Sequence, residues 1–109
     1  MSTPTFYIKT GDLLPAIRAQ LVGAGGSIQK LPNGVTVRFH LNDAVGASVV
    51  DAPAVIESEA RGVVAYEWVL GDTDTAGTYT AEFEVEIAGK TMTFPNDGDI
   101  TVVISPELA

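Results

Sequence analysis

The feature that most constrains the fold is a stretch of strict alternation between residues 78 and 87. Apolar residues there alternate one by one with threonines and glutamates. A period of two places alternate side chains on opposite faces of a β-strand, whereas a helix would scatter them around its circumference. The stretch therefore predicts a strand with a core-facing side and an acidic side. The inward residues are Tyr79, Ala81, Phe83, Val85 and Ile87, and the outward ones are Thr78, Thr80, Glu82, Glu84 and Glu86.

The rest of the chain consists of shorter apolar segments separated by 11 glycines and 6 prolines. This punctuation predicts an all-β protein, because no helical period persists for long. The segment 13–22 fits a helix or a strand, since Leu13, Ile17 and Leu21 share a face in either form, and we predict a strand. Further strands are expected at 6–9, 35–41, 47–50, 54–57, 62–69, 91–94 and 100–104, with Pro53 interrupting the middle of the series and a turn at 95–98.

Short strands at this spacing are typical of a β-sandwich, with a barrel as the alternative. We predict a single immunoglobulin-like β-sandwich of about seven short antiparallel strands over residues 1–109, with a flexible N-terminal tail. Two features favour the immunoglobulin-like form. Trp68 lies in a mid-chain strand, and the segment Asp74 to Tyr79, which includes Gly77, resembles a tyrosine corner. The alternative for Tyr79 is a plain core aromatic at a strand start.

Charge and composition exclude several function classes. Of 109 residues, 14 are Asp or Glu and 6 are Lys or Arg, giving a net charge of −8. The few basic residues are scattered, which disfavours nucleic acid and anionic membrane surfaces as partners. No apolar run approaches the roughly 20 residues that span a bilayer. There are 0 cysteines, so disulfides and thiolate sites are excluded. The start of the chain does not resemble a secretory signal.

Few residues offer chemistry. His40 is the single histidine, and its neighbours predict a surface position rather than a catalytic or metal site. The segment Asp72 to Gly77 begins like a calcium loop, but its fifth position is Ala76 and its twelfth is Phe83. We therefore predict no cofactor, with calcium near Asp72 and Asp74 as a minor alternative. Asn96 to Asp99 is expected to serve a turn, although a cation or a sugar is conceivable there.

Three segments are candidate interfaces. The outward glutamates Glu82, Glu84 and Glu86 are expected to form a solvated face, with docking of a basic partner as the alternative. The N-terminal residues 2–10, with Thr5, Phe6 and Tyr7, and the loop 23–27, with Gly25, are expected to be flexible until a neighbour orders them.

A family resemblance covers most of the chain. It rests on 71–85, on Gly89 to Gly98 with its Thr-Phe-Pro-Asn-Asp-Gly turn, on Gly11-Asp-Leu-Leu-Pro15, on 35–39 and on 66–68. Together these resemble the N-terminal domain of the tailed-phage baseplate upper protein family. The resemblance implies an immunoglobulin-like virion domain used in assembly, in which Gly77, Tyr79, Phe94, Pro95 and Gly98 are architectural. That family's chain usually continues into an arm, whereas this sequence stops at Ala109, so the arm's function is not carried over.

The sequence thus predicts a non-enzymatic bacteriophage virion protein that acts as a tail, baseplate or neck adaptor or as a decoration module. Its expected partners are other virion proteins, with several symmetric copies in the particle. It is expected to be made and assembled in the bacterial host cytoplasm. The alternative is a module on the virion that binds a receptor or carbohydrate through its polar loops. A small hydrolase is a distant third, because no nucleophile and base pair is evident.

Overall fold

The computed structural model describes residues 4–23, 25–95 and 98–108, and these form strands and turns without a helix. The strands are β1 (Thr5–Lys9), β2 (Ile17–Gln20), β3 (Thr36–Asn42), β4 (Ser48–Pro53), β5 (Val55–Ser58), β6 (Val63–Tyr66), β7 (Gly77–Ile87), β8 (Lys90–Phe94) and β9 (Ile100–Ser105). The alternating stretch is the longest of them, and its apolar residues face inward as predicted.

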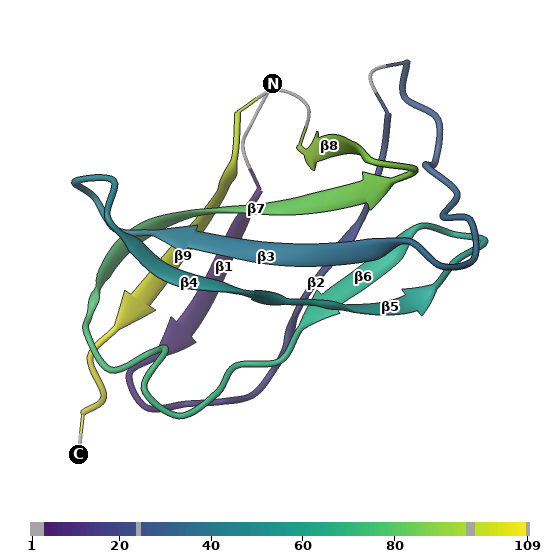
Figure 1. Cartoon of the computed structure of the whole chain (residues 1–109). Coiled ribbons are helices and arrows are strands. Elements are labelled where there is room, and N and C mark those ends of the chain that lie inside the picture. Colours follow the sequence, from purple (N-terminus) through teal and green to yellow (C-terminus); the bar gives the residue numbers. More distant parts are fainter. Residues whose placement is uncertain (1–3, 24, 96–97, 109) are drawn as a thin grey trace.

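The strands form two packed sheets (Figure 1). The larger sheet has the order β1-β9-β7-β3-β4, with β8 pairing the second half of β7, and the smaller has the order β2-β6-β5. In the lettering of immunoglobulin domains, β2, β6 and β5 correspond to strands B, E and D, and β3, β7 and β9 to strands C, F and G. The predicted immunoglobulin-like β-sandwich is confirmed. The strand count differs, because the described residues contain nine strands rather than about seven.

The N-terminal segment is the main departure from the prediction. Residues 5–9 form β1, which pairs in parallel with β9 from Thr5 opposite Thr101 to Lys9 opposite Ser105. The expectation of a flexible tail is therefore wrong for this part, and that of purely antiparallel strands is wrong for one pair. The alternation of Phe6 and Ile8 toward the core explains the docking, because Ile8 is buried and Phe6 is partly buried against the core. Residues 2 and 3 of the expected tail lie outside the described part.

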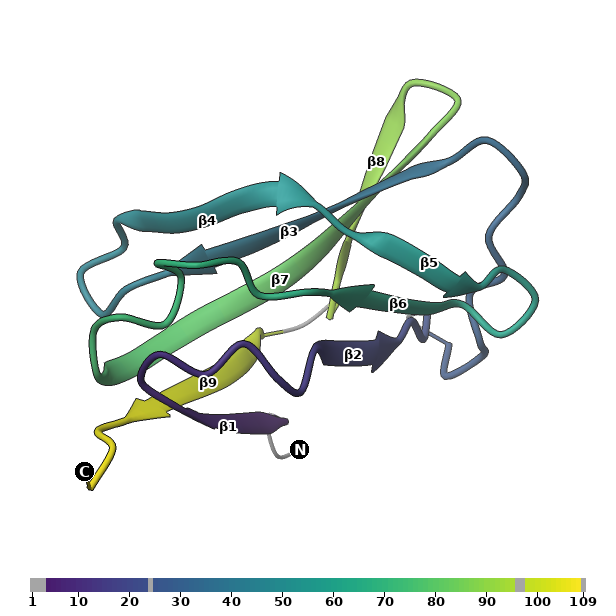
Figure 2. The ribbon, with the colours of Figure 1, turned by 90° about the horizontal axis from the view of Figure 1, so that it is seen from below.

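The chain passes from one sheet to the other between β4 and β5. Figure 2 shows β4 running into β5 with little change of direction. A single residue, Ala54, separates them, and its N–H donates to the carbonyl of Val37 at 2.8 Å. Pro53 ends β4 at the edge of its sheet, where the missing N–H does no harm. The predicted pair of short strands is thus confirmed, with the break one residue after the proline.

The segment 13–22, which fitted a helix or a strand, is extended and contributes β2. Ile17 lies opposite Tyr66 and Ala19 opposite Val64, so the inward residues of β2 complete the smaller sheet's core face. The side chain of Arg18 crosses Ala65 on the outer face and pairs with Glu57 of β5 at 2.9 Å. The small alanine of the middle strand leaves room for this bridge.

An aromatic cluster joins the two sheets. Phe39 of β3 is fully buried, stacks on Tyr66 with ring centroids 4.6 Å apart, and meets the edge of Trp68 at 5.7 Å. The ring centroid of Phe83 of β7 lies 5.1 Å from that of Phe39. Trp68 is buried, but the prediction that it lies in a strand is wrong, because β6 ends at Tyr66. The tryptophan of antibody domains lies instead on strand C. In this chain Phe39 occupies strand C, and Trp68 approaches it from the opposite sheet.

Candidate functional site

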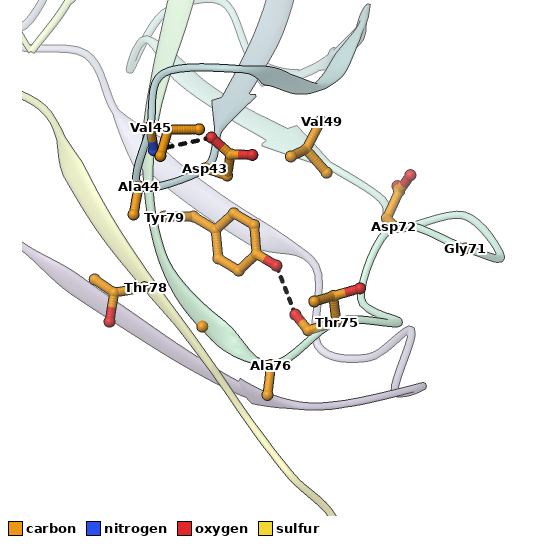
Figure 3. A pocket seen from close by; sticks show the side chains of 11 residues that line it. Asp43, Ala44, Val45, Val49, Gly71, Asp72, Thr75, Ala76, Thr78 and Tyr79 are labelled. Carbon is orange, nitrogen blue, oxygen red and sulfur yellow. Dashed lines mark hydrogen bonds between the residues drawn. The ribbon is translucent and has the colours of Figure 1, made fainter.

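The connection between β6 and β7, residues 67–76, carries the predicted tyrosine corner. The hydroxyl of Tyr79 donates to the carbonyl of Thr75 at 2.6 Å, across the base of a hollow of about 380 Å³ (Figure 3). A Cβ on Gly77 would lie 3.5 Å from the Tyr79 ring, in ordinary contact. The backbone N–H of Asp74 donates to the carbonyl of Gly71 at 3.4 Å. The corner is confirmed, and Asp74, which faces solvent, takes part in it through its backbone.

A second tyrosine holds the start of the same connection. The hydroxyl of Tyr66 donates to Oδ2 of Asp72 at 2.5 Å, and the N–H of Val69 donates to the same oxygen at 3.0 Å. Burial, together with the neighbouring Asp72 carboxylate, raises the pKa of Tyr66 far above its ordinary value of 10.0. The phenol therefore stays neutral and available as a donor. The sequence did not predict this pair, because it depends on how the intervening loop is folded.

Of the two predicted calcium ligands, Asp72 already has other contacts for its side chain. The carboxylate of Asp72 accepts hydrogen bonds within the protein, and the Thr73 between the two aspartates is fully buried with its hydroxyl donating to the carbonyl of Asp12 at 3.0 Å. In the part of the chain that the structure describes, no group of three or more His, Asp or Glu side chains is arranged to hold a metal ion. The described residues therefore supply no set of donor side chains for the calcium alternative.

The acidic stripe lies on the outer face of the larger sheet. Glu82 and Glu84 are opposite His40 and Arg38 of β3, and Glu86 is opposite Thr36. His40 is half-buried between two carboxylates, with Nδ1 at 3.5 Å from Asp51 and Nε2 at 3.8 Å from Glu84. Arg38 pairs with Asp51 at 2.9 Å. The stripe keeps its predicted outward position, and among the described residues the basic side chains directly opposite it are those of Arg38 and His40 on β3.

The N-terminal candidates divide between the two sides of β1. Tyr7 points outward and is 69% exposed, on the same face as Thr5 and the acidic stripe. Phe6 points inward, with its ring centroid 5.9 Å from that of Trp68. The prediction of Phe6 as an interface residue is therefore corrected. Its phenyl ring extends the aromatic cluster.

Gly25 lies elsewhere, in the connection between β2 and β3. Its loop is closed by backbone hydrogen bonds, from Gly23 N–H to the Ser27 carbonyl at 2.8 Å and from Gly26 N–H to the Gly23 carbonyl at 2.9 Å. Gly25 is exposed, and residue 24 of this loop lies outside the described part of the chain.

The remaining architectural candidates surround the end of β8. Phe94 is buried and lies opposite Phe83 in the sheet. Pro95 follows through a cis peptide bond, and Gly98 has a φ of 74°. The turn residues 96 and 97 lie outside the described residues, so the proposed cation or sugar site there has no geometry to examine.

Fold and surface together define an immunoglobulin-like β-sandwich whose larger sheet has an acidic outer face. No family model matches the chain, and no curated protein matches it. Among solved structures, the chain is similar to CopC from Methylosinus trichosporium OB3b, with a TM-score of 0.55 and 12% sequence identity over 98% of this chain and 89% of that one. At this identity the likeness shows the fold alone. Among the described residues, none lies in a helix able to cross a membrane.

Proposed function

We propose that this chain is a non-enzymatic structural protein of a bacteriophage virion, an adaptor or decoration module that docks on other virion proteins. The observation that carries the proposal is the outer face of the larger sheet, where Glu82, Glu84 and Glu86 occupy alternate positions of β7 and point outward together. The similarity of the chain to the tailed-phage baseplate upper protein family supplies the virion as the setting. The residues that carry this similarity have architectural positions here, among them Tyr79 in its corner and Phe94 in the core.

The charge of this face favours a basic partner. On one side of the stripe, Arg38 and His40 are the neighbours, and both are already in contact with Asp51. On the other side, Thr91 and Thr93 of β8 lie opposite Glu86 and Glu84 and carry no charge. The face therefore keeps an excess of negative charge, and opposite charges across an interface raise the association rate and select the partner. In a symmetric virion ring, each copy would present this face in the same way.

The first test is location. Antibodies raised against the purified domain are applied to purified particles in immuno-electron microscopy, and quantitative mass spectrometry of the same particles gives the copy number. We expect label at a defined ring of the tail, baseplate or neck, with a copy number that matches the symmetry of that ring. Absence of the protein from intact particles would overturn the proposal.

The second test is charge. Glu82→Gln with Glu86→Gln removes two carboxylates from the face and leaves the contact of Glu84 with His40 in place. The matched control, Glu59→Gln with Glu107→Gln, makes the same change of net charge at two positions outside the strands of the larger sheet. We expect the first pair to reduce incorporation into particles, with the loss growing as the ionic strength is lowered, and the control to leave it unchanged. Equal effects of both pairs would remove the acidic face from the proposal.

Receptor or carbohydrate binding is the alternative, and one observation favours it. Tyr7 is 69% exposed, and an exposed aromatic ring beside polar side chains is a common element of ligand recognition. A glycan array probed with the domain and with Tyr7→Ala decides it. Binding that the variant abolishes would replace the adaptor role by a receptor-binding role.

A further inference from the structure

Three loops meet at one end of the sandwich, on the left of Figure 2 near the C-terminus. They connect β1 to β2 (10–16), β3 to β4 (43–47) and β6 to β7 (67–76). Each of them exposes aliphatic side chains: Leu14 is 80% exposed, Val45 89%, Val69 57% and Leu70 88%. Scattered exposed leucines need no explanation, but several on one end of a small domain mark an interaction surface. We call these three loops the loop end.

The exposed side chains stand on turns that aspartates hold in place. In the turn from Val69 to Asp72, the N–H of Asp72 donates to the Val69 carbonyl and the N–H of Val69 donates back to the Asp72 carboxylate, each at 3.0 Å. Leu70 lies at the tip. Gly71 follows with a φ of 101°, which a side chain would strain and which the third position of a type II turn requires.

In the hairpin between β3 and β4, an aspartate carboxylate again accepts backbone N–H groups of its own turn. Oδ1 of Asp43 accepts the N–H groups of Val45 at 3.1 Å and Ala47 at 2.9 Å, and the N–H of Asp43 donates to the Ala47 carbonyl at 2.9 Å. Val45 is thereby fixed in an exposed position. Figure 3 shows Asp43, Val45 and Val49 on one side of the hollow and Asp72 and Thr75 on the other, with Tyr79 between them.

The loop between β1 and β2 is fastened to the loop between β6 and β7. The N–H of Gly11 donates to the Thr73 carbonyl at 3.1 Å, and the buried hydroxyl of Thr73 donates to the Asp12 carbonyl. Between these loops a groove of about 740 Å³ is lined by Leu13, Leu14, Pro15 and Trp68, among others. The indole N–H of Trp68 is buried and has no hydrogen-bond acceptor among the described residues. Binding to a surface fixed in this way costs little conformational entropy.

The charge of the loop end restricts its partner. The three loops carry Asp12, Asp43, Glu67, Asp72 and Asp74 and contain no lysine, arginine or histidine. The nearby Arg18 is paired with Glu57. A second copy docking through the same end would place acids against acids, and like charges across an interface oppose association.

We propose that the loop end is a second docking surface, which takes a protein partner that presents protruding aliphatic side chains inside a rim of lysine or arginine. The aliphatic side chains enter the hollow beside Val45 and the groove beside Leu14, and the basic rim faces the aspartates. An adaptor needs two such surfaces. This one is distinct from the acidic sheet face in position and in its apolar character.

The first experiment titrates the isotope-labelled protein with a short peptide that carries a leucine pair between lysine pairs, followed by NMR. We expect shifts of the backbone amides of 43–47 and 69–73. Matched peptides with glutamate in place of lysine, or serine in place of leucine, are expected to bind at least about tenfold more weakly. Equal binding of the serine peptide, or shifts confined to 82–86, would overturn the proposal.

Variants assign the binding to its surface. Val45→Ser with Leu70→Ser is expected to weaken the leucine and lysine peptide about tenfold, because the contact area it removes is apolar. Both side chains are largely exposed, so the variant is expected to unfold at the parent's temperature. Val55→Ser is the control, since Val55 is 47% exposed on β5, away from the loop end. Loss of binding in the control, or none in the variant, would contradict the proposal.

A photo-crosslinking amino acid in place of Leu70 tests the surface in particles, with the same probe in place of Glu84 on the sheet face. We expect the Leu70 probe to crosslink to a protein other than this chain, at a peptide of that protein that is rich in aliphatic and basic residues. Crosslinks to a second copy, or crosslinks from position 84 alone, would overturn it. If the protein is absent from particles, the adaptor role fails, while the peptide titration still decides whether the loop end binds.

Discussion

The β6–β7 connection has two halves, which we call its legs: the first follows β6 and the second leads into β7. Each leg is held by a tyrosine hydroxyl, but the two hydroxyls have different acceptors. Tyr66, at the end of β6, donates to the carboxylate of Asp72 at 2.5 Å, and Tyr79, early in β7, donates to the carbonyl of Thr75 at 2.6 Å. The first ring is stacked on Phe39 in the aromatic cluster, while the second lies beside the backbone of Gly77. One leg is therefore fastened to the core through a charged acceptor, and the other through a neutral one.

The difference separates a property of the fold from a property of this chain. The corner of Tyr79 is a general device of immunoglobulin-like sandwiches, and it serves the crossing from one sheet to the other. The pair of Tyr66 with Asp72 instead connects the core to the turn that exposes Leu70. The first leg is expected to carry more of the stability and to affect the proposed docking surface, and the second to affect stability alone.

The largest effect is expected when the ring of Tyr66 is removed. Tyr66→Ala leaves a cavity against Phe39 and Trp68 and is expected to lower the free energy of unfolding by about 3–5 kcal/mol. Urea unfolding followed by Trp68 fluorescence measures it. The exposed Tyr7→Ala is the control and should have little effect. A loss below about 1 kcal/mol would show that the cluster does not hold the leg.

Removing the Tyr66 hydroxyl alone is the next step. Tyr66→Phe keeps the ring and leaves the Asp72 carboxylate with the Val69 N–H, so we expect a loss of about 1.5–3 kcal/mol, as for hydrogen bonds to charged groups. Hydrogen exchange at the amides of 69–72 should speed up in parallel. Exchange that stays as slow as in the parent would mean that the turn holds itself without the tyrosine.

Sequence patterns predicted one leg of this comparison and not the other. The strand of Tyr79 is marked by its period of two, and the corner by a short segment directly before it, so both signals are local. The bond from Tyr66 to Asp72 depends on the path of the intervening loop, and no short pattern encodes that path. The predicted site residues divide in the same way, because the glutamates of β7 took their predicted face while Phe6 did not.

The position of Phe6 depends on a pairing between the two ends of the chain. Alternation in 5–9 indicates a strand, but the choice of β9 as its parallel partner depends on the whole core. The same holds for the loop end, where turns far apart in sequence meet. The sequence contains the aspartates, glycines and aliphatic residues of these turns, and the fold brings them to one surface.

Alkaline pH distinguishes the legs without a mutation. The pKa of Tyr66 is raised above its ordinary value of 10.0, so the phenol is neutral in both the folded and the unfolded chain below that pH, and its contribution is fully present. Above pH 10.0 the unfolded tyrosine loses its proton while the folded one keeps it. Stability should then fall by about 1.4 kcal/mol per pH unit from this group. The stability of the Tyr66→Phe variant should fall with pH less steeply by this amount. Equal slopes for the variant and the parent would contradict the assignment of this pH dependence to Tyr66.

The smallest effect is expected at the corner itself. Tyr79→Phe removes a hydrogen bond between neutral groups and leaves the Thr75 carbonyl near the open hollow, where water can replace the phenol, so we expect a loss of about 0.5–1.5 kcal/mol in urea unfolding. Because Val69 and Leu70 are held by Asp72, binding of the leucine and lysine peptide should stay unchanged in this variant and weaken in Tyr66→Phe. Equal weakening in both would show that the two legs act as one unit, and that Tyr79 also positions the loop end.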